Sequence, residues 1–399
     1  ASKGEKMLSG YSRGKAVQWT VEQEAELDRL IAAHDVTVSL LPYAYHPMVA
    51  EKCIAHKKSM VTTSYVKPEM KALDKEAREA GVLLLNEIGV DPGIDHMSAM
   101  RIIDYIHQNH GKVEEFYSIT GALVAPEGAS DNPFGYKFSW SPKGVAIAGK
   151  DLFKKTFFEN FAGLGNMEVY ANRNSIEYID TYGIPEVQTM FRGTFRHQGW
   201  CESVDALKEL GMLDEEPVEM SGMSYAGLVA SKINAKPGEN LKRQVAAFLG
   251  KPENSMAVEA VEWLGLLSDK PVGRKEDSPF EVTSDLMIDS MMLSGQEREM
   301  VAMQHTFLAN FEGKKEVIKS RLLAFGSMDT ETSIARTVSL PAAVAVRMIL
   351  EDEITLAGVY RPTAAQIYNP VLDELEKLDI AMNEEYGLPE TASISLDLE

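Results

Sequence analysis

Short apolar runs alternate with segments of helical periodicity between residues 16 and 107, and this alternation restricts the fold more than any other feature of the chain. We predict strands at residues 16–20, 35–41, 60–64 and 82–85. We predict helices between and after them at residues 21–34, 47–56, 68–80 and 96–107. Pro47 and Pro68 would each open a helix, and Gly81 would end the third helix. Strands that alternate with helices in this way form a parallel sheet with right-handed crossovers.

The carboxyl ends of parallel strands meet at one edge of the sheet, where open α/β folds bind their ligands. Pro42 and Tyr43 follow the second predicted strand, and Ser64 and Tyr65 lie at the end of the third. A loop at residues 87–91 follows the fourth. We therefore predict one candidate site at this edge. For the two tyrosines, packing at the border of the core is the alternative to contact with a ligand.

The fourth strand runs into a loop with two carboxylates, in the sequence GVLLLNEIGVDPGIDH. Asp91, Pro92 and Gly93 form a turn, because Pro fixes φ, Gly permits unusual dihedral angles and Asp accepts bonds from nearby amides. Asp95 is expected to be the N-cap of the helix that follows. Asp91 has two open interpretations, a group of the active site or an acceptor for amides at the helix start. We expect Glu87 to be a solvated loop carboxylate.

The rest of the chain lacks this regular alternation. We expect an N-terminal sheet domain at residues 1–96 and an α+β domain at residues 97–199 and 273–330, with a strand at 317–326. Residues 200–272 are rich in helical pattern and indicate a small helical insert. Residues 331–399 are expected to form a long apolar helix, which contains Pro341, and a tail that packs back towards the N-terminal domain.

A second cluster of polar side chains lies in the sequence MFRGTFR. Strand alternation places Arg192, Thr194 and Arg196 on one face, and Phe195 on the other. The planar guanidinium binds carboxylates through two parallel hydrogen bonds, so this face is suited to an anionic ligand. Arg173 is another isolated cation nearby in the sequence. Structural arginines that pair with acidic neighbours are the alternative.

Composition excludes several classes of partner. The net charge of −20 argues against nucleic acid and anionic membranes, and no run of residues is expected to span a bilayer. The two cysteines form neither a disulfide framework nor a metal cluster, which fits the cytoplasm. No metal site is expected, because the histidines lack ligand spacing. The sequence contains no phosphate-binding G-x-G-x-x-G fingerprint, G-x-S-x-G elbow or P-loop.

Several long motifs resemble those of the glutamate-forming saccharopine dehydrogenases, over nearly the whole chain and in the same order. They are SLLPYAYHP, VTTSY, LLNEIGVDPGIDH, SDNPFGYKFSW and MFRGTFRHQG. The resemblance implies an NAD- or NADP-linked enzyme of lysine metabolism that interconverts saccharopine with L-glutamate and α-aminoadipate semialdehyde. Hydride would leave the carbon attached to the secondary amine, and water would hydrolyse the resulting imine.

The resemblance also implies site residues. Contacts with the cofactor would fall on Thr20, Val21, Pro42, Ser64, Tyr65, Val90, Asp91, Pro92 and Trp140. Contacts with saccharopine would fall on Ser64, Tyr65, Asp91, Arg173, Thr194, Phe195 and Arg196. Asp91 and Tyr65 would handle protons, whereas Arg173 and Arg196 would bind carboxylates. Many relatives carry Cys at the position of Thr120, so a role for a thiol would not transfer.

The family begins with a strand, a glycine-rich turn, a helix and a second strand whose end selects NAD or NADP, and these are not in this sequence. The expected fold is therefore α/β, an N-terminally incomplete Rossmann-like parallel sheet domain followed by an α+β substrate domain with a helical insert. We expect very weak binding of both cofactors and little or no turnover, because the glycine turn normally holds the pyrophosphate. The choice of cofactor stays open, and so does the oligomeric state, a homodimer included. The alternatives are a related dehydrogenase for another carboxylated secondary amine, such as a carboxy-polyamine, and a non-catalytic homologue.

Overall fold

The computed structural model describes residues 2–139, 153, 155–172, 174–328 and 331–395, and the chain forms two compact units. The first unit comprises Ala1–Arg101 and Val338–Leu375. The second comprises Ile102–Thr337 and Glu376–Glu399. All three divisions fall inside helices, which are α6 (Ile94–Gln108), α15 (Ser333–Leu350) and α16 (Ala365–Glu376).

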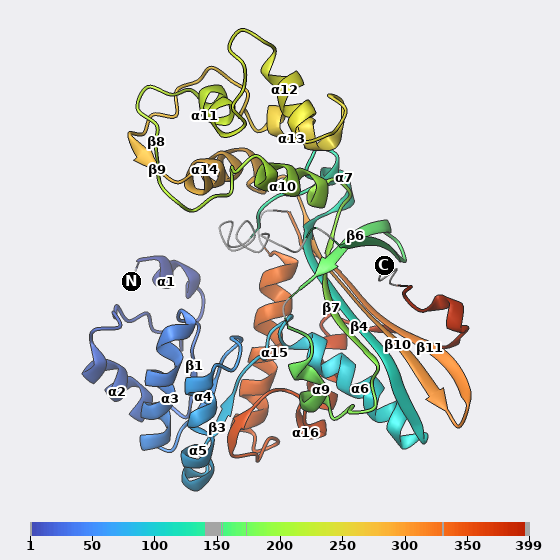
Figure 1. Ribbon diagram of the computed structural model, residues 1–399. Helices are drawn as coiled ribbons and strands as arrows, with labels where there is room; N and C mark the ends of the chain where they lie inside the picture. The colour runs from blue at the N-terminus through green and yellow to red at the C-terminus, as the bar shows by residue number, and fades with distance from the viewer. Residues whose placement is uncertain (1, 140–152, 154, 173, 329–330, 396–399) are drawn as a thin grey trace. The chain divides into compact units, whose positions relative to one another are not determined.

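The first unit contains a parallel sheet of four short strands in the order β1-β2-β3-β12, of which Figure 1 labels β1 and β3. The strands are β1 (Val36–Val38), β2 (Ser59–Val61), β3 (Leu83–Leu85) and β12 (Gly358–Tyr360). Its helices are α1 (Ser2–Met7), α2 (Glu24–Ala32), η1 (Tyr43–Tyr45), α3 (His46–Ala55), α4 (Pro68–Ala72), α5 (Asp74–Ala80) and α16 (Ala365–Glu376), of which α16 ends in the second unit. Apolar side chains from α2, α3 and α5 pack with those of β2 and β3 in one buried core. The predicted parallel sheet is confirmed.

Two local predictions in this unit are wrong, and a third is correct except at one residue. No strand forms at residues 16–20, where Trp19 Nε1 donates to Gln23 O at 3.0 Å and the Thr20 amide donates to Gln23 Oε1 at 3.0 Å. These bonds fold the segment onto itself, so its polar groups are not offered to a strand. The predicted helix at 68–80 is divided at Leu73 into α4 and α5. Asp95 is not an N-cap, because α6 begins one residue earlier.

The second unit is built on a seven-stranded mixed sheet in the order β13-β11-β10-β4-β7-β6-β5 (Figure 1). The strands are β4 (Gly111–Val124), β5 (Thr156–Phe161), β6 (Gly165–Ala171), β7 (Thr189–Arg196), β10 (Glu299–Phe311), β11 (Lys314–Phe325) and β13 (Asn383–Leu388). The β4–β7 pair is parallel and the other pairs are antiparallel. The strand predicted at 317–326 is confirmed as part of β11.

Helices cover much of the sequence after β7, as the pattern predicts. They are α10 (Trp200–Glu209), α11 (Tyr225–Lys232), α12 (Leu241–Phe248), α13 (Met256–Trp263) and α14 (Pro279–Met291). Shorter elements of this unit are α7 (Pro126–Ala129), α9 (Glu177–Tyr182), β8 (Val218–Glu219), β9 (Glu276–Asp277) and η3 (Glu390–Ala392). Trp200 of α10 is fully buried and joins the core formed with the sheet, which also contains Phe161 and Phe195.

Helix α15 contains Pro341, as expected. Contrary to the prediction that no run could span a bilayer, α15 is long and apolar enough to do so, the one such helix in the part of the chain that the structure describes. Core helices of water-soluble proteins have the same length and composition, so this property alone assigns no membrane.

Candidate active site

The loops that follow β2 and β3 run side by side beyond the ends of the strands. The Thr62 amide donates to Leu85 O at 2.9 Å, and the Glu87 amide donates to Ser64 O at 3.1 Å. This pairing brings Tyr65 to Asp91, where the tyrosine Oη donates to the carboxylate Oδ1 at 3.2 Å. Two of the residues predicted at the sheet edge therefore form one hydrogen-bonded pair.

Asp91 is carried on a tight loop that depends on glycine. The Gly89 amide donates to Pro92 O at 2.9 Å, and the Ile94 amide donates to Gly89 O at 2.9 Å. Gly93 has φ +150°, and a Cβ on it would lie 2.0 Å from Gly89 O. Only glycine fits there. The predicted turn is confirmed, and Asp95 accepts a bond from the Gly93 amide at 2.6 Å rather than capping the helix.

Ser64 belongs to a buried network centred on His46. The imidazole Nδ1 lies 2.8 Å from Ser39 Oγ, and Nε2 lies 2.8 Å from Ser64 Oγ and 3.3 Å from Thr62 Oγ1. Burial of the ring lowers the pKa of His46, because a charged imidazolium loses its hydration there. The sequence did not predict His46 as a site residue. Its only signal was its place in SLLPYAYHP, the segment that directly follows β1.

We expect His46 to make the protein less stable in mild acid. The unfolded state binds a proton near pH 6.5, whereas the folded pKa of His46 lies lower, so the free energy of unfolding falls as the pH drops below that value. Chemical denaturation from pH 7.5 to 5 should give a flatter dependence for His46→Gln than for the wild type. The exposed His34→Gln is the control. An equal dependence of the unfolding free energy on pH in all three proteins would contradict this prediction. It would show that His46 takes up a proton as readily in the folded protein as in the unfolded one.

Glu87 corrects the sequence prediction, because its side chain is fully buried rather than solvated. Its Oε2 accepts from His96 Nε2 at 2.8 Å, and its Oε1 accepts from Arg361 Nε at 2.9 Å. Burial alone would raise the pKa of Glu87, but the bond from His96, the charges of His96 and Arg361 and a backbone amide hold it below its usual value. The carboxylate is therefore ionised. Arg361 follows β12, whose end lies at the same edge as those of β2 and β3.

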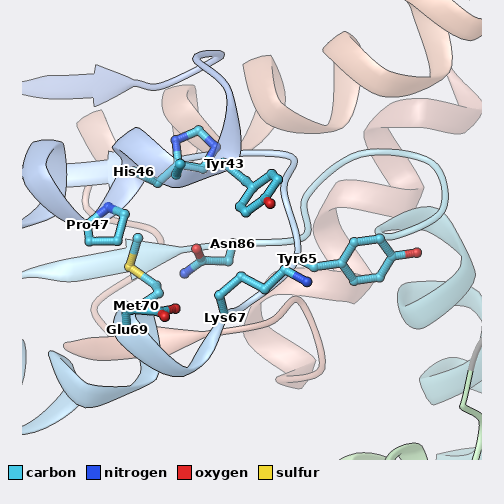
Figure 2. A pocket seen from close by; sticks show the side chains of 9 residues that line it. Tyr43, His46, Pro47, Tyr65, Lys67, Glu69, Met70 and Asn86 are labelled. Atoms are coloured by element: carbon cyan, nitrogen blue, oxygen red, sulfur yellow. The ribbon is translucent and has the colours of Figure 1, made fainter. Parts of the chain in front are cut away.

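A cavity of about 210 Å³ opens beside these loops (Figure 2). It is lined by Tyr43, Ala44, His46, Pro47, Tyr65, Lys67, Glu69, Met70 and Asn86. The ammonium of Lys67 lies 5.6 Å from the centroid of the Tyr43 ring, within the range of a cation–π contact. In Figure 2 the ring of Tyr65 extends away from the other labelled side chains, consistent with its bond to Asp91.

The other residues predicted for this site form no described side-chain bond with the Tyr65–Asp91 pair or the His46 network. Pro42 is exposed at the end of the β1 loop, and Val90 flanks Asp91. Thr20 is exposed and bonded to Gln23 rather than to the strand ends, and Val21 is half-buried. Trp140 and Arg173 lie outside the described residues.

The face predicted on β7 is present in the second unit. Arg192, Thr194 and Arg196 are buried, and the Arg192 guanidinium lies 4.4 Å from the centroid of the Tyr178 ring. Phe195 points to the other face and packs in the core against Phe161. A direct contact of the Phe195 side chain with a ligand is therefore not supported by its position.

Arg196 is surrounded by aromatic rings, at 5.0 Å from Tyr136, 5.5 Å from Tyr170 and 5.3 Å from Trp200. Its side chain donates from Nη1 to Phe195 O at 2.9 Å, whereas Nε has no partner among the described residues. Glu168 is its neighbour across the β6–β7 pair, but that carboxylate accepts bonds from the amides of Gly199 and Cys201. Within the described residues, Arg196 forms no ion pair. A buried guanidinium that pairs with no carboxylate of the described residues favours an anionic ligand over the structural alternative.

The sequence matches two family models in succession. One is described as the saccharopine dehydrogenase NADP binding domain and matches residues 2–85. The other is described as the saccharopine dehydrogenase C-terminal domain and matches residues 89–380. This chain belongs to the saccharopine dehydrogenase family. The resemblance seen in the sequence motifs is thus confirmed.

Relatives of known name match over nearly the whole chain. A Schizosaccharomyces pombe protein named saccharopine dehydrogenase [NADP(+), L-glutamate-forming] is 35% identical over 96% of this chain and 91% of its own length. The mitochondrial alpha-aminoadipic semialdehyde synthase of Mus musculus is 35% identical over 91% of this chain, which spans 42% of that protein. The apo structure of the Saccharomyces cerevisiae saccharopine dehydrogenase (L-Glu forming) aligns with a TM-score of 0.88 and 33% identity, over 96% of this chain and 91% of the yeast chain. The predicted α/β class is confirmed by that likeness.

Proposed function

We propose that this member of the family is an NADP-dependent oxidoreductase that interconverts saccharopine with L-glutamate and α-aminoadipate semialdehyde, in lysine metabolism. The observation that carries the proposal is the 35% identity to a glutamate-forming, NADP-linked enzyme over 91% of that enzyme's length. NADP rather than NAD is favoured by the names of the relatives and by the match of residues 2–85 to an NADP binding model. We also propose a cytoplasmic location, since both cysteines are unpaired and buried.

The described residues fit the nicotinamide end of a dinucleotide at the sheet edge. Four parallel strands end there, and the cavity beside them offers aromatic, hydroxyl and ammonium groups to a ligand. When bound, NADP would accept or return the hydride. Four side chains would hold the nicotinamide end of NADP, those of Tyr43, Ser64, Tyr65 and Lys67.

The Tyr65–Asp91 pair is suited to moving the proton of the reaction. Oxidation of a secondary amine releases the proton on its nitrogen, and Asp91 Oδ1 can accept it directly or through Tyr65 Oη. In the reverse direction the pair returns the proton to the nitrogen. The half-buried position of both residues limits competition by water.

Arg196 is proposed to bind a carboxylate of the substrate. Saccharopine carries three carboxylates. A buried guanidinium whose Nε has no partner among the described residues can donate to one of them through a charge-assisted bond. Thr194 lies on the same face of β7 and can add a neutral hydrogen bond. Arg173 is proposed as a second cation for a carboxylate, because it is an isolated cation close to β7 in the sequence.

The reductive reaction tests the proposal. NADPH consumption should require both glutamate and the semialdehyde, and NADH should support a rate at least about tenfold lower in kcat/KM, equivalent to about 1.4 kcal/mol. A carboxy-polyamine in place of saccharopine, in the oxidative direction, should give no comparable rate. Preference for the polyamine would assign the other carboxylated secondary amine, and failure of every substrate would indicate a non-catalytic homologue.

A further inference from the structure

Glu87 touches the backbone on both sides of Tyr65. Its amide donates to Ser64 O at 3.1 Å, immediately before Tyr65 in the chain. Its carboxylate Oε1 accepts from the Val66 amide at 2.8 Å, immediately after Tyr65. One residue thus fixes the two peptide units that flank the tyrosine, whereas its side chain does not reach Tyr65 Oη in any described bond.

We call the bonds of Glu87 to Ser64 O and to the Val66 amide the clamp on Tyr65. The carboxylate of this clamp is itself held by two charged or polar side chains from other elements. His96 comes from the first turn of α6, and Arg361 comes from the end of β12. They bond to different carboxylate oxygens, Oε2 and Oε1 respectively. With Val66 as the third donor, the orientation of the carboxylate is determined from three directions.

The conformation and the burial of Glu87 both cost free energy, and a residue with only a packing role would not need either. Glu87 has φ +59°, a left-handed backbone conformation that residues other than glycine rarely adopt. A fully buried carboxylate also loses its hydration, and a well-packed apolar residue often serves stability equally well. Strain and buried charge of this kind concentrate at functional sites, where the surrounding structure over-determines them.

We propose that Glu87 is a positioning residue that holds Tyr65 Oη in bonding distance of Asp91 and is itself oriented by His96 and Arg361. For its effect on turnover this inference rests on the proposed function. Glu87 does not touch the reacting atoms. It acts on the reaction through Tyr65, by restricting the loop that carries this side chain.

Glu87→Gln is the first test. The two carboxylate oxygens of Glu87 accept from three donors, whereas the side chain of Gln offers them only one acceptor oxygen. We expect kcat for saccharopine oxidation to fall about 10- to 100-fold, the effect of displacing a catalytic group by about 1 Å, with KM within about threefold of the wild type. Hydrogen–deuterium exchange of the Val66 amide should accelerate about tenfold or more, and that of the β3 amides should not change.

Asp74→Asn is the matched control. Asp74 also accepts a backbone amide, from Val359 at 2.8 Å, and an arginine, Arg78 Nε at 2.8 Å, in the same unit. It contacts β12 without contacting the Tyr65 or Asp91 loops in any described bond. This variant should retain both kcat and the slow exchange of Val66.

A double-mutant cycle with Tyr65→Phe decides whether Glu87 acts through Tyr65. We expect the two losses in kcat not to multiply, so that the double variant is within about threefold of Tyr65→Phe alone. Losses that multiply, or exchange at Val66 that stays slow in Glu87→Gln, overturn the inference. If Glu87→Gln does not fold, the same measurements on Arg361→Gln decide, with smaller losses in the same direction. If the wild type does not oxidise saccharopine, the proposed function fails, and the exchange comparison still tests the clamp.

Discussion

Replacement of Asp91 by Asn is expected to lower kcat for saccharopine oxidation by about 100-fold or more, the usual contribution of a general acid or base. Asn keeps the size of the side chain and can accept the bond from Tyr65 Oη, so the loop should fold as before. It cannot take up the proton that leaves the substrate nitrogen. Steady-state rates across pH, together with chemical denaturation of the same preparations, provide the measurement.

Asp95→Asn is the control for this prediction, since it makes the same chemical change in the first turn of α6, the helix that follows the Asp91 loop. Asp95 Oδ1 accepts from the Gly93 amide at 2.6 Å, which is a structural role. We expect this variant to lose more unfolding free energy and less turnover than Asp91→Asn. Near-normal turnover of Asp91→Asn at every pH would mean that Asp91 only shapes the turn.

Replacement of Arg196 by Ala is expected to weaken saccharopine binding about 10- to 150-fold, the effect of losing a charge-assisted hydrogen bond worth about 1.5–3 kcal/mol. NADP binding should change less than about twofold, because the cofactor is proposed to bind at the strand ends of the first unit. Titration of saccharopine and of NADPH, each followed by calorimetry, measures both affinities. Denaturation is needed as well, since removal of a buried side chain leaves space among Tyr136, Tyr170 and Trp200.

Arg298→Ala is the matched control in the same unit. The Arg298 guanidinium also lies over an aromatic ring, 5.0 Å from the centroid of Phe325, but it is paired with Glu127 at 2.8 Å. Its loss should leave the affinity for saccharopine unchanged. Equal losses of affinity for saccharopine and NADPH in Arg196→Ala would assign Arg196 to the stability of its fold instead.

The parallel sheet and its edge could be predicted because their signals are local. Apolar runs of four to seven residues, Pro68 at a helix start and Gly81 at a helix end, with φ +69°, each determine the conformation of their own segment. The edge follows from the topology alone, and it brought Tyr65 and Asp91 together as expected.

The role of Glu87 could not be predicted because it depends on residues far away in the sequence. Its partner Arg361 lies 274 residues later, after a strand of three residues that is too short to stand out in the sequence. Once β12 joins β3, the guanidinium neutralises a carboxylate that its own segment would leave in water. Arg196 illustrates the opposite case, since strand alternation correctly gave its face but gave no sign of the aromatic rings around it.

The products of saccharopine oxidation test the proposed function most directly. The secondary amine of saccharopine can be oxidised at either of its two flanking carbons, and only oxidation on the side of the lysine skeleton releases glutamate. With NADP+ and saccharopine, we expect chromatography to find L-glutamate in an amount equal to the NADPH formed, together with α-aminoadipate semialdehyde. Release of lysine and 2-oxoglutarate, or NADPH formation without glutamate, would contradict the glutamate-forming reaction proposed for this protein.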